Sequence, residues 1–184
     1  MEVVLRKVTW IVAALLMAGT PSVAGADVKP IVAVLPLAAN DTGIPYSVLP
    51  SASELSIMTG QLRAGLEGAS VSLVVQRQVA LAASTAGFDQ TVPARSCAVV
   101  ECAQSIGRAV HADEVVVGAV TRQMAVIWGT SLSIVDVRTG RIIVAENFGY
   151  KGDVQAMEHG ERTAGGCLGR VIRGQKPCPP DAGW

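Results

Sequence analysis

The stretch from residue 97 to residue 140 constrains the fold more than any other part of the chain. Residues 99–110 carry apolar side chains at helical spacing. Residues 114–121 follow at once and are rich in Val, as expected for a strand buried on both faces. The pattern then alternates toward a turn that contains Gly140. A helix that leads into a buried strand and then a hairpin predicts an α/β fold.

The amino-terminal residues have the three parts of a secretory signal. Two basic residues precede the apolar run 8–18, and the small residues Ala24 and Ala26 follow at cleavage-site spacing. We expect a signal peptide over residues 1–26, cleavage before Asp27, and a periplasmic location in a Gram-negative-type bacterium. The run is shorter than the roughly 20 residues of a membrane span. The alternative is a retained amino-terminal anchor. A lipid anchor is not expected, because no Cys follows the cut.

Length and charge set the class of the exported part. Residues 27–174 suit one α/β domain, and residues 175–184 form a Pro-rich carboxyl-terminal tail. The chain has 15 basic and 15 acidic residues, so long-range attraction to nucleic acid or to an anionic membrane is not expected. We find no second apolar stretch that could span a membrane. The sequence leaves the oligomeric state open.

All four cysteines lie in the exported part, where an even count favours disulfides. Three pairings are possible. Residues 97 and 102 within one regular helix would have Cα atoms roughly 8 to 9 Å apart, beyond disulfide reach. A bond between them therefore needs Cys97 in the loop before the helix. We favour Cys97 with Cys102 and Cys167 with Cys178, the second holding the tail.

The other elements complete a single small α/β domain. Ser51 and Glu54 have capping-box spacing at the start of a first helix. Gly68 stands where a helix cap is expected, and we expect Gly107 to pack over Gly118. Glycines weaken the last helix, whose middle we expect to bend or break. We predict a mixed sheet of about five strands with two or three longer helices, from these elements: strand 28–37, loop 38–50, helix 51–67, strand 71–75, short helix 76–84, loop 86–96, helix 99–110, strand 114–121, strands 124–137 and 142–150, and helix 153–172.

Several short motifs occur together in one order. Cys97-x4-Cys102-Ala103 and Ile106-Gly107 precede Ala112-Asp113 and a Val-rich strand, and Val135-Asp136-Val137-x-Thr139-Gly140 closes the series. The series resembles the amino-terminal domain of TolB and the related CsgG and LpoB lipoproteins, and most closely an uncharacterised periplasmic domain family of unknown function. The resemblance spans residues 28–149.

The resemblance implies an α/β fold akin to anticodon-binding domains, used for protein–protein contact in the cell envelope. Its motifs determine the fold, so it carries over no catalytic residues and no cofactor. The chain departs from these families because it has no lipid-attachment Cys, β-propeller or long membrane-spanning hairpins. Pore formation and a TolB-like role are therefore not expected.

Candidate chemistry in the sequence has simpler structural interpretations. A redox dithiol usually has two residues between its cysteines, so Cys97 and Cys102 indicate a structural disulfide. Metal binding would need more ligands than His111 and His159, and neither a His-Glu-x-x-His nor a His-x-His pattern is present. Asp136 is expected to accept hydrogen bonds from turn amides. Glu158 and Glu161 are expected on a solvated helix face. No nucleophile elbow or phosphate-binding loop occurs. We therefore expect no enzyme.

The loop 38–50 is long for a compact domain, and long loops are often functional. Its residues Asn40, Asp41 and Tyr46 are the candidates for partner or ligand contact. The first hypothesis is a non-catalytic periplasmic module that binds an envelope protein. The alternative is an accessory protein of an exported redox enzyme that binds a small molecule or cofactor. A thiol oxidoreductase is a third.

Overall fold

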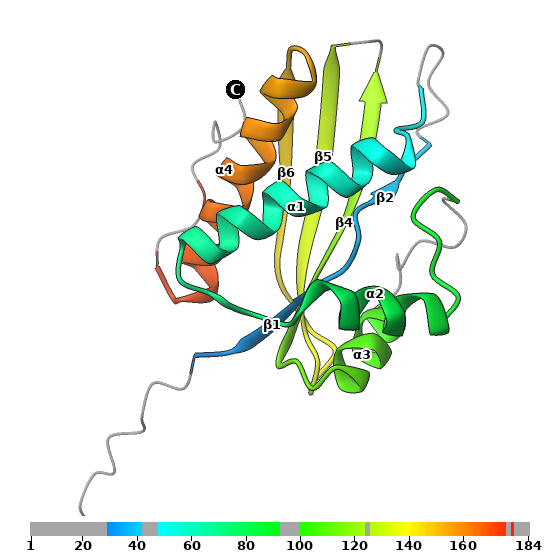
Figure 1. The fold of residues 1–184 in the computed structure, drawn as a ribbon. Helices are drawn as coiled ribbons and strands as arrows, with labels where there is room; N and C mark the ends of the chain where they lie inside the picture. Colours follow the sequence, from blue (N-terminus) through cyan, green and yellow to red (C-terminus); the bar gives the residue numbers. More distant parts are fainter. Residues whose placement is uncertain (1–28, 42–47, 93–99, 124–125, 176–177, 179–184) are drawn as a thin grey trace, which may run out of the picture.

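The computed structural model describes residues 29–41, 48–92, 100–123, 126–175 and 178. It shows one α/β domain with a mixed sheet of six strands and helices on both faces (Figure 1). The predicted fold class is confirmed. The expected signal peptide, Tyr46 and Cys97 lie outside the described residues. Within the described residues, no helix is long and apolar enough to cross a membrane.

The sheet has the order β3-β1-β4-β5-β6, with β2 paired to β4 off this path. β1, β2 and β3 run parallel to their neighbours, whereas β4, β5 and β6 form an antiparallel meander. The expected first strand is two short strands, because Leu35–Leu37 interrupts the pairing with β4. The strands are β1 (Ile31–Val34), β2 (Ala38–Ala39), β3 (Ser72–Leu73), β4 (Glu114–Gln123), β5 (Ile127–Asp136) and β6 (Ile142–Lys151).

Four helices cover the sheet in two pairs: α1 (Ala52–Gly68), α2 (Gln76–Thr85), α3 (Val100–Ala109) and α4 (Val154–Ile172). In Figure 1, α1 and α4 cross one face and α2 and α3 gather near one end of the sheet. The first pair encloses a core that includes Leu62, Leu132 and Leu168. The second pair covers a smaller core with Val79 and Ile106. β5 alternates as predicted: Trp128, Leu132 and Ile134 are buried, while Ser131 is exposed.

Local signals place helix and turn boundaries as expected. The side chain of Ser51 accepts from Glu54 N, and Glu54 Oε2 accepts from Ser51 N, which completes the capping box of α1. Asp136 accepts from Thr139 N at 2.6 Å, and Gly140 has φ of 72°. These hydrogen bonds lower the pKa of Asp136. The interpretation of Asp136 as a turn residue is confirmed.

Three expectations about glycine were wrong. The expected break in α4 does not occur: the helix is continuous through its four glycines, which lie where α1 packs closely or where the Tyr150 ring packs on the helix backbone. Gly107 packs on Val115 and Val137, whereas Gly118 packs on Leu37 and Leu132 at the other face, so these two glycines do not meet. Gly68 ends α1 without a left-handed backbone, which Ser70 adopts instead with φ of 62°.

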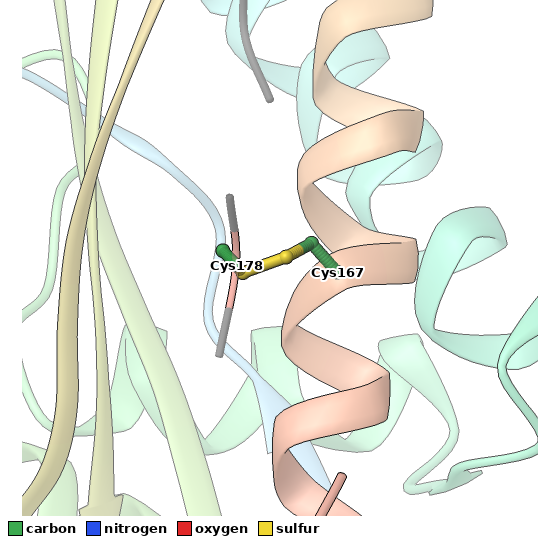
Figure 2. Close-up of a disulfide and its surroundings, with 2 residues drawn as sticks. All are labelled: Cys167 and Cys178. Carbon is green, nitrogen blue, oxygen red and sulfur yellow. A yellow bond between two sulfur atoms is a disulfide. The ribbon is translucent and has the colours of Figure 1, made fainter. Parts of the chain in front are cut away.

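A disulfide joins Cys167 of α4 to Cys178 in the segment that follows the helix (Figure 2). Their Cα atoms are 5.5 Å apart. Cys167 is buried, and Cys178 packs against the core beneath α1 and α4. Cys102 is half-buried in α3. Its predicted partner, Cys97, lies outside the described residues, so that pairing stays a prediction.

Candidate functional site

The candidate loop is anchored on β4 at both of its ends. Asn40 N donates to Val120 O at 2.8 Å before the loop, and Val48 N donates to Arg122 O at 3.1 Å after it. Residues 42–47, which include Tyr46, are outside the described residues. Asn40 and Asp41 are exposed. The fold therefore fixes the loop's two ends on the strand that leads into the β4–β5 hairpin.

The side chain of Arg122, on β4, links helix α1 to the end of the sheet on which the candidate loop begins and ends. Its guanidinium donates to Glu54 Oε1 of α1 at 3.0 Å. The same group lies 4.4 Å from the centre of the Trp128 ring, a cation–π distance. Arg122 thereby joins the start of α1 to the strands that carry the loop. A loop seated on such a fixed base can hold contact residues in place.

Three large apolar side chains are exposed around this base. Val48, Leu49 and Val126 are 51%, 47% and 44% exposed. Val126 O accepts from Gly152 N at the open end of the β5–β6 pair, next to the β4–β5 hairpin. Together with Asn40 and Asp41, these residues form what we call the loop-end surface. Apolar side chains beside polar ones are typical of a protein–protein contact.

A cluster of polar side chains is buried between α4 and the sheet behind this surface. Glu161 of α4 is fully buried and accepts a hydrogen bond from the Thr130 hydroxyl of β5. Trp128 Nε1, Tyr150 Oη and Glu161 Oε2 are buried and have no hydrogen-bond partner among the described residues. We call Trp128, Thr130, Tyr150 and Glu161 the buried polar cluster. Burial raises the pKa of Glu161 to about 8, and burial followed by the Glu161 charge raises that of Tyr150.

The prediction that Glu161 lies on a solvated face was wrong. The apolar stripe of α4 runs through Met157, Ala164 and Leu168, all buried. Helical spacing requires one more inward residue between Met157 and Ala164, and Glu161 occupies that position. The missing apolar residue between Met157 and Ala164 was the sequence signal that position 161 faces the core. A charged residue type obscured it, because Glu is almost never fully buried without a partner.

A second group of acids lies at the opposite end of β4. Burial raises the pKa of Glu114 to about 7, and the charges of Asp136 and Asp113 add to the effect. Glu114 Oε2 is buried without a hydrogen-bond partner among the described residues. Asp113 Oδ2 accepts from Ile31 N at 2.8 Å. Asp113 thus holds the start of β1 and Asp136 the turn before β6, and no basic side chain is among the influences that shift the Glu114 pKa.

The two histidines are exposed and far apart in the fold, at the end of α3 and on α4. Within the described part of the chain, no group of three or more His, Cys, Asp or Glu side chains is placed to hold a metal ion.

A shallow groove of about 580 Å³ lies between α2 and α3. It is lined by apolar side chains that include Leu81, Ala82 and Ile106, with Gln78 and His111 among its polar residues. Leu81 is among the most exposed large apolar residues of the described chain. The two helices that form it lie near the end of the sheet opposite the β4–β5 hairpin (Figure 1).

The fold is similar to those of two solved proteins, the carboxyl-terminal domain of LpoB and the lipoprotein GNA1162. The carboxyl-terminal domain of LpoB from Salmonella enterica matches with a TM-score of 0.50 and 21% identity, covering 70% of this chain and 87% of that domain. Lipoprotein GNA1162 from Neisseria meningitidis matches with a TM-score of 0.52 and 17% identity, covering 67% and 81%. No protein-family model and no curated protein matches the sequence. At these identities the likeness concerns the fold, and it includes the LpoB part of the predicted resemblance.

Proposed function

We propose that this chain is a non-catalytic binding module of the bacterial cell envelope that acts by contacting another protein through its loop-end surface. The observation that carries the proposal is the exposure of Val48, Leu49 and Val126 around a base fixed by Arg122. Asn40 and Asp41 supply the polar rim, and Tyr46 belongs to the same loop.

The predicted export signal and the fold likeness to LpoB and GNA1162 support a place in the envelope. The shape of the site supports binding more than catalysis. Its exposed residues are apolar or simple polar side chains, and the buried acid, phenol and indole behind them do not reach solvent. An interface of this kind works through shape and apolar contact.

Photo-crosslinking in the periplasm tests this proposal. A photoreactive amino acid replaces Leu49 or Val126 in the full chain, and a matched control places it at Leu81, which is exposed on α2. We expect one discrete crosslinked protein from positions 49 and 126 and none from 81. We also expect Asp41→Lys to weaken that product several-fold. The same products from all three positions, or none from 49 and 126, would overturn the proposal.

The groove between α2 and α3 favours a second candidate function, the binding of a small, largely apolar molecule. Its volume of about 580 Å³ lies within the usual range of ligand sites. A binder of the folded state must raise the melting temperature. A thermal-shift screen against quinones and other small apolar molecules should therefore find a ligand whose effect disappears in Ala82→Trp. A flat screen removes this candidate.

A further inference from the structure

The contacts of Glu161 suit a neutral carboxylic acid. Its side chain has no exposure to solvent, and Thr130 is its one hydrogen-bond donor among the described residues. Its second oxygen, Oε2, has no partner there. A buried carboxylate keeps its charge only when cations or several donors replace the lost water. Here the Thr130 hydroxyl is the single donor that replaces the lost water.

The cations near α4 have other partners. Arg122 of β4 pairs with Glu54 and lies over Trp128. Arg63 of α1 pairs with Glu67 at 3.7 Å and donates to Val74 O. On α4 itself, Arg162 donates to Gln61 of α1 at 2.9 Å, and His159 is exposed. None of these cations is among the influences that shift the Glu161 pKa.

The acidic groups around Glu161 do not favour its ionised form either. Tyr150 of β6 is buried in the same cluster, and its ring packs on the backbone of Gly160. Glu146 lies two positions before the buried Phe148, hence on the same sheet face. Glu158, one turn earlier on α4, is half-buried. Ionised Glu161 would add a further negative charge to this side of the sheet.

We propose that Glu161 makes the docking of α4 on the sheet pH-dependent: α4 is held while the carboxyl is protonated and opens more often when it must ionise. The device goes beyond the proposed binding function. Opening of α4 exposes Tyr150 and Trp128. The Trp128 ring packs against the Arg122 guanidinium, and the backbone of Arg122 holds the end of the candidate loop at Val48. Low pH therefore tightens the same region that holds the candidate loop.

The sign follows from proton linkage. The carboxyl has a pKa near 4.5 when α4 is open to water and about 8 when α4 is docked. Between these values the open form releases a proton that the docked form keeps, so each pH unit increases opening about tenfold. Below the lower value and above the higher one, opening stops depending on this group.

Hydrogen exchange of the full chain tests the device. Exchange of the α4 amides is followed by mass spectrometry from about pH 5 to pH 7, corrected for intrinsic rates, in the wild type, Glu161→Gln and the matched control Glu158→Gln. We expect the wild type and Glu158→Gln to show an opening equilibrium that rises about a hundredfold over this range. We expect Glu161→Gln to show almost no change, because the amide keeps the shape and cannot ionise.

Three results would overturn the proposal: no pH dependence in the wild type, the full dependence in Glu161→Gln, or the same dependence in α2 and α3, which would mean unfolding of the whole domain. If Glu161→Gln fails to fold, the Glu161 carboxyl carbon is titrated by NMR in the ¹³C-labelled wild type. A midpoint above pH 7 supports the device, and any lower midpoint contradicts it.

Discussion

Glu114 occupies the first position of β4, where burial and then the charges of Asp136 and Asp113 raise its pKa to about 7. A folded-state pKa above the usual 4.5 means that folding favours the protonated form. Stability from this group is complete below about pH 4.5 and is lost as the pH rises through 7. The acid is therefore a source of instability at neutral pH.

We predict that Glu114→Gln raises the free energy of unfolding at pH 7.5 by up to about 1 kcal/mol, after allowance for partial exposure to solvent. At pH 4 the variant should show no gain, since wild-type Glu114 is then protonated. Urea unfolding at the two pH values measures the difference. Glu101→Gln, on the exposed face of α3 and in its first turn, is the control. It loses a favourable interaction with the helix dipole and should lower stability at pH 7.5 by less than about 1 kcal/mol, the opposite sign to Glu114→Gln.

Single residues were predictable from sequence where their partners are near in the chain. The Ser51 and Glu54 box and the Asp136 turn each involve residues three apart. Glu161 was not predicted, because its environment comes from Thr130 and Tyr150 on strands that only folding brings beneath α4. A residue type gives only a preference for burial or exposure, and tertiary packing decides which of the two occurs.

At the scale of elements, α1 and α4 pack together through glycine. A Cβ on Gly165 would overlap the Leu62 carbonyl, and one on Gly65 would overlap backbone atoms of Arg162 and Gly166. Backbone atoms cannot move aside as a flexible side chain can. The close crossing therefore depends on the absence of side chains at these positions.

We predict that Gly165→Ala destabilises the protein by about 1 to 3 kcal/mol through overpacking of this crossing. Gly60→Ala is the matched control, because Gly60 lies inside α1 with no atom near its missing Cβ. It should stabilise the protein by about 0.5 to 1 kcal/mol through helix propensity. Paired thermal unfolding curves decide; destabilisation of similar size in both variants would contradict the packing argument.

The same glycines show what an element-level pattern leaves open. The four glycines predicted a bend or a break in the middle of α4, because intrinsic helix propensity was the only energy term that the sequence offers, and the break does not occur. In the fold they permit contact that outweighs the propensity loss, and the helix runs through all 19 residues. The expected meeting of Gly107 and Gly118 failed for a related reason. Sequence identifies small residues, but not which sheet face each one serves.

At the scale of the whole molecule, the order of elements and the α/β class followed from periodicity, since both are local properties summed along the chain. The strand order and the division of the helices between two faces were not predictable in the same way. A long loop before α1 could be singled out by its length, although the predicted bounds 38–50 began two residues early, since Ala38–Ala39 form β2. Asn40 and Asp41 are exposed, and their role as contact residues stays a prediction. The contacts that support the ends of this loop could not be predicted, because Arg122, Glu54 and Trp128 come from three separate elements.

The disulfide between Cys167 and Cys178 acts on the stability of the whole domain. It closes a loop of 11 residues and holds the segment after α4 against the main core (Figure 2). A loop of this length restricts the unfolded chain by about 3 kcal/mol. We predict that the double variant Cys167→Ala, Cys178→Ala loses about that much stability, measured by urea unfolding without reductant.

Reductant separates this bond from any other in the chain. A dithiol should lower the stability of the wild type by at least the loss seen in the double variant, because it opens this bond and every other accessible one. The double variant should respond to the dithiol only through its remaining cysteines. Equal stability of the wild type and the double variant without reductant would contradict the prediction. In that case the apolar contacts of α4 with α1 and the sheet would hold this end of the domain unaided, since Cys167 lies among them on the buried face of the helix.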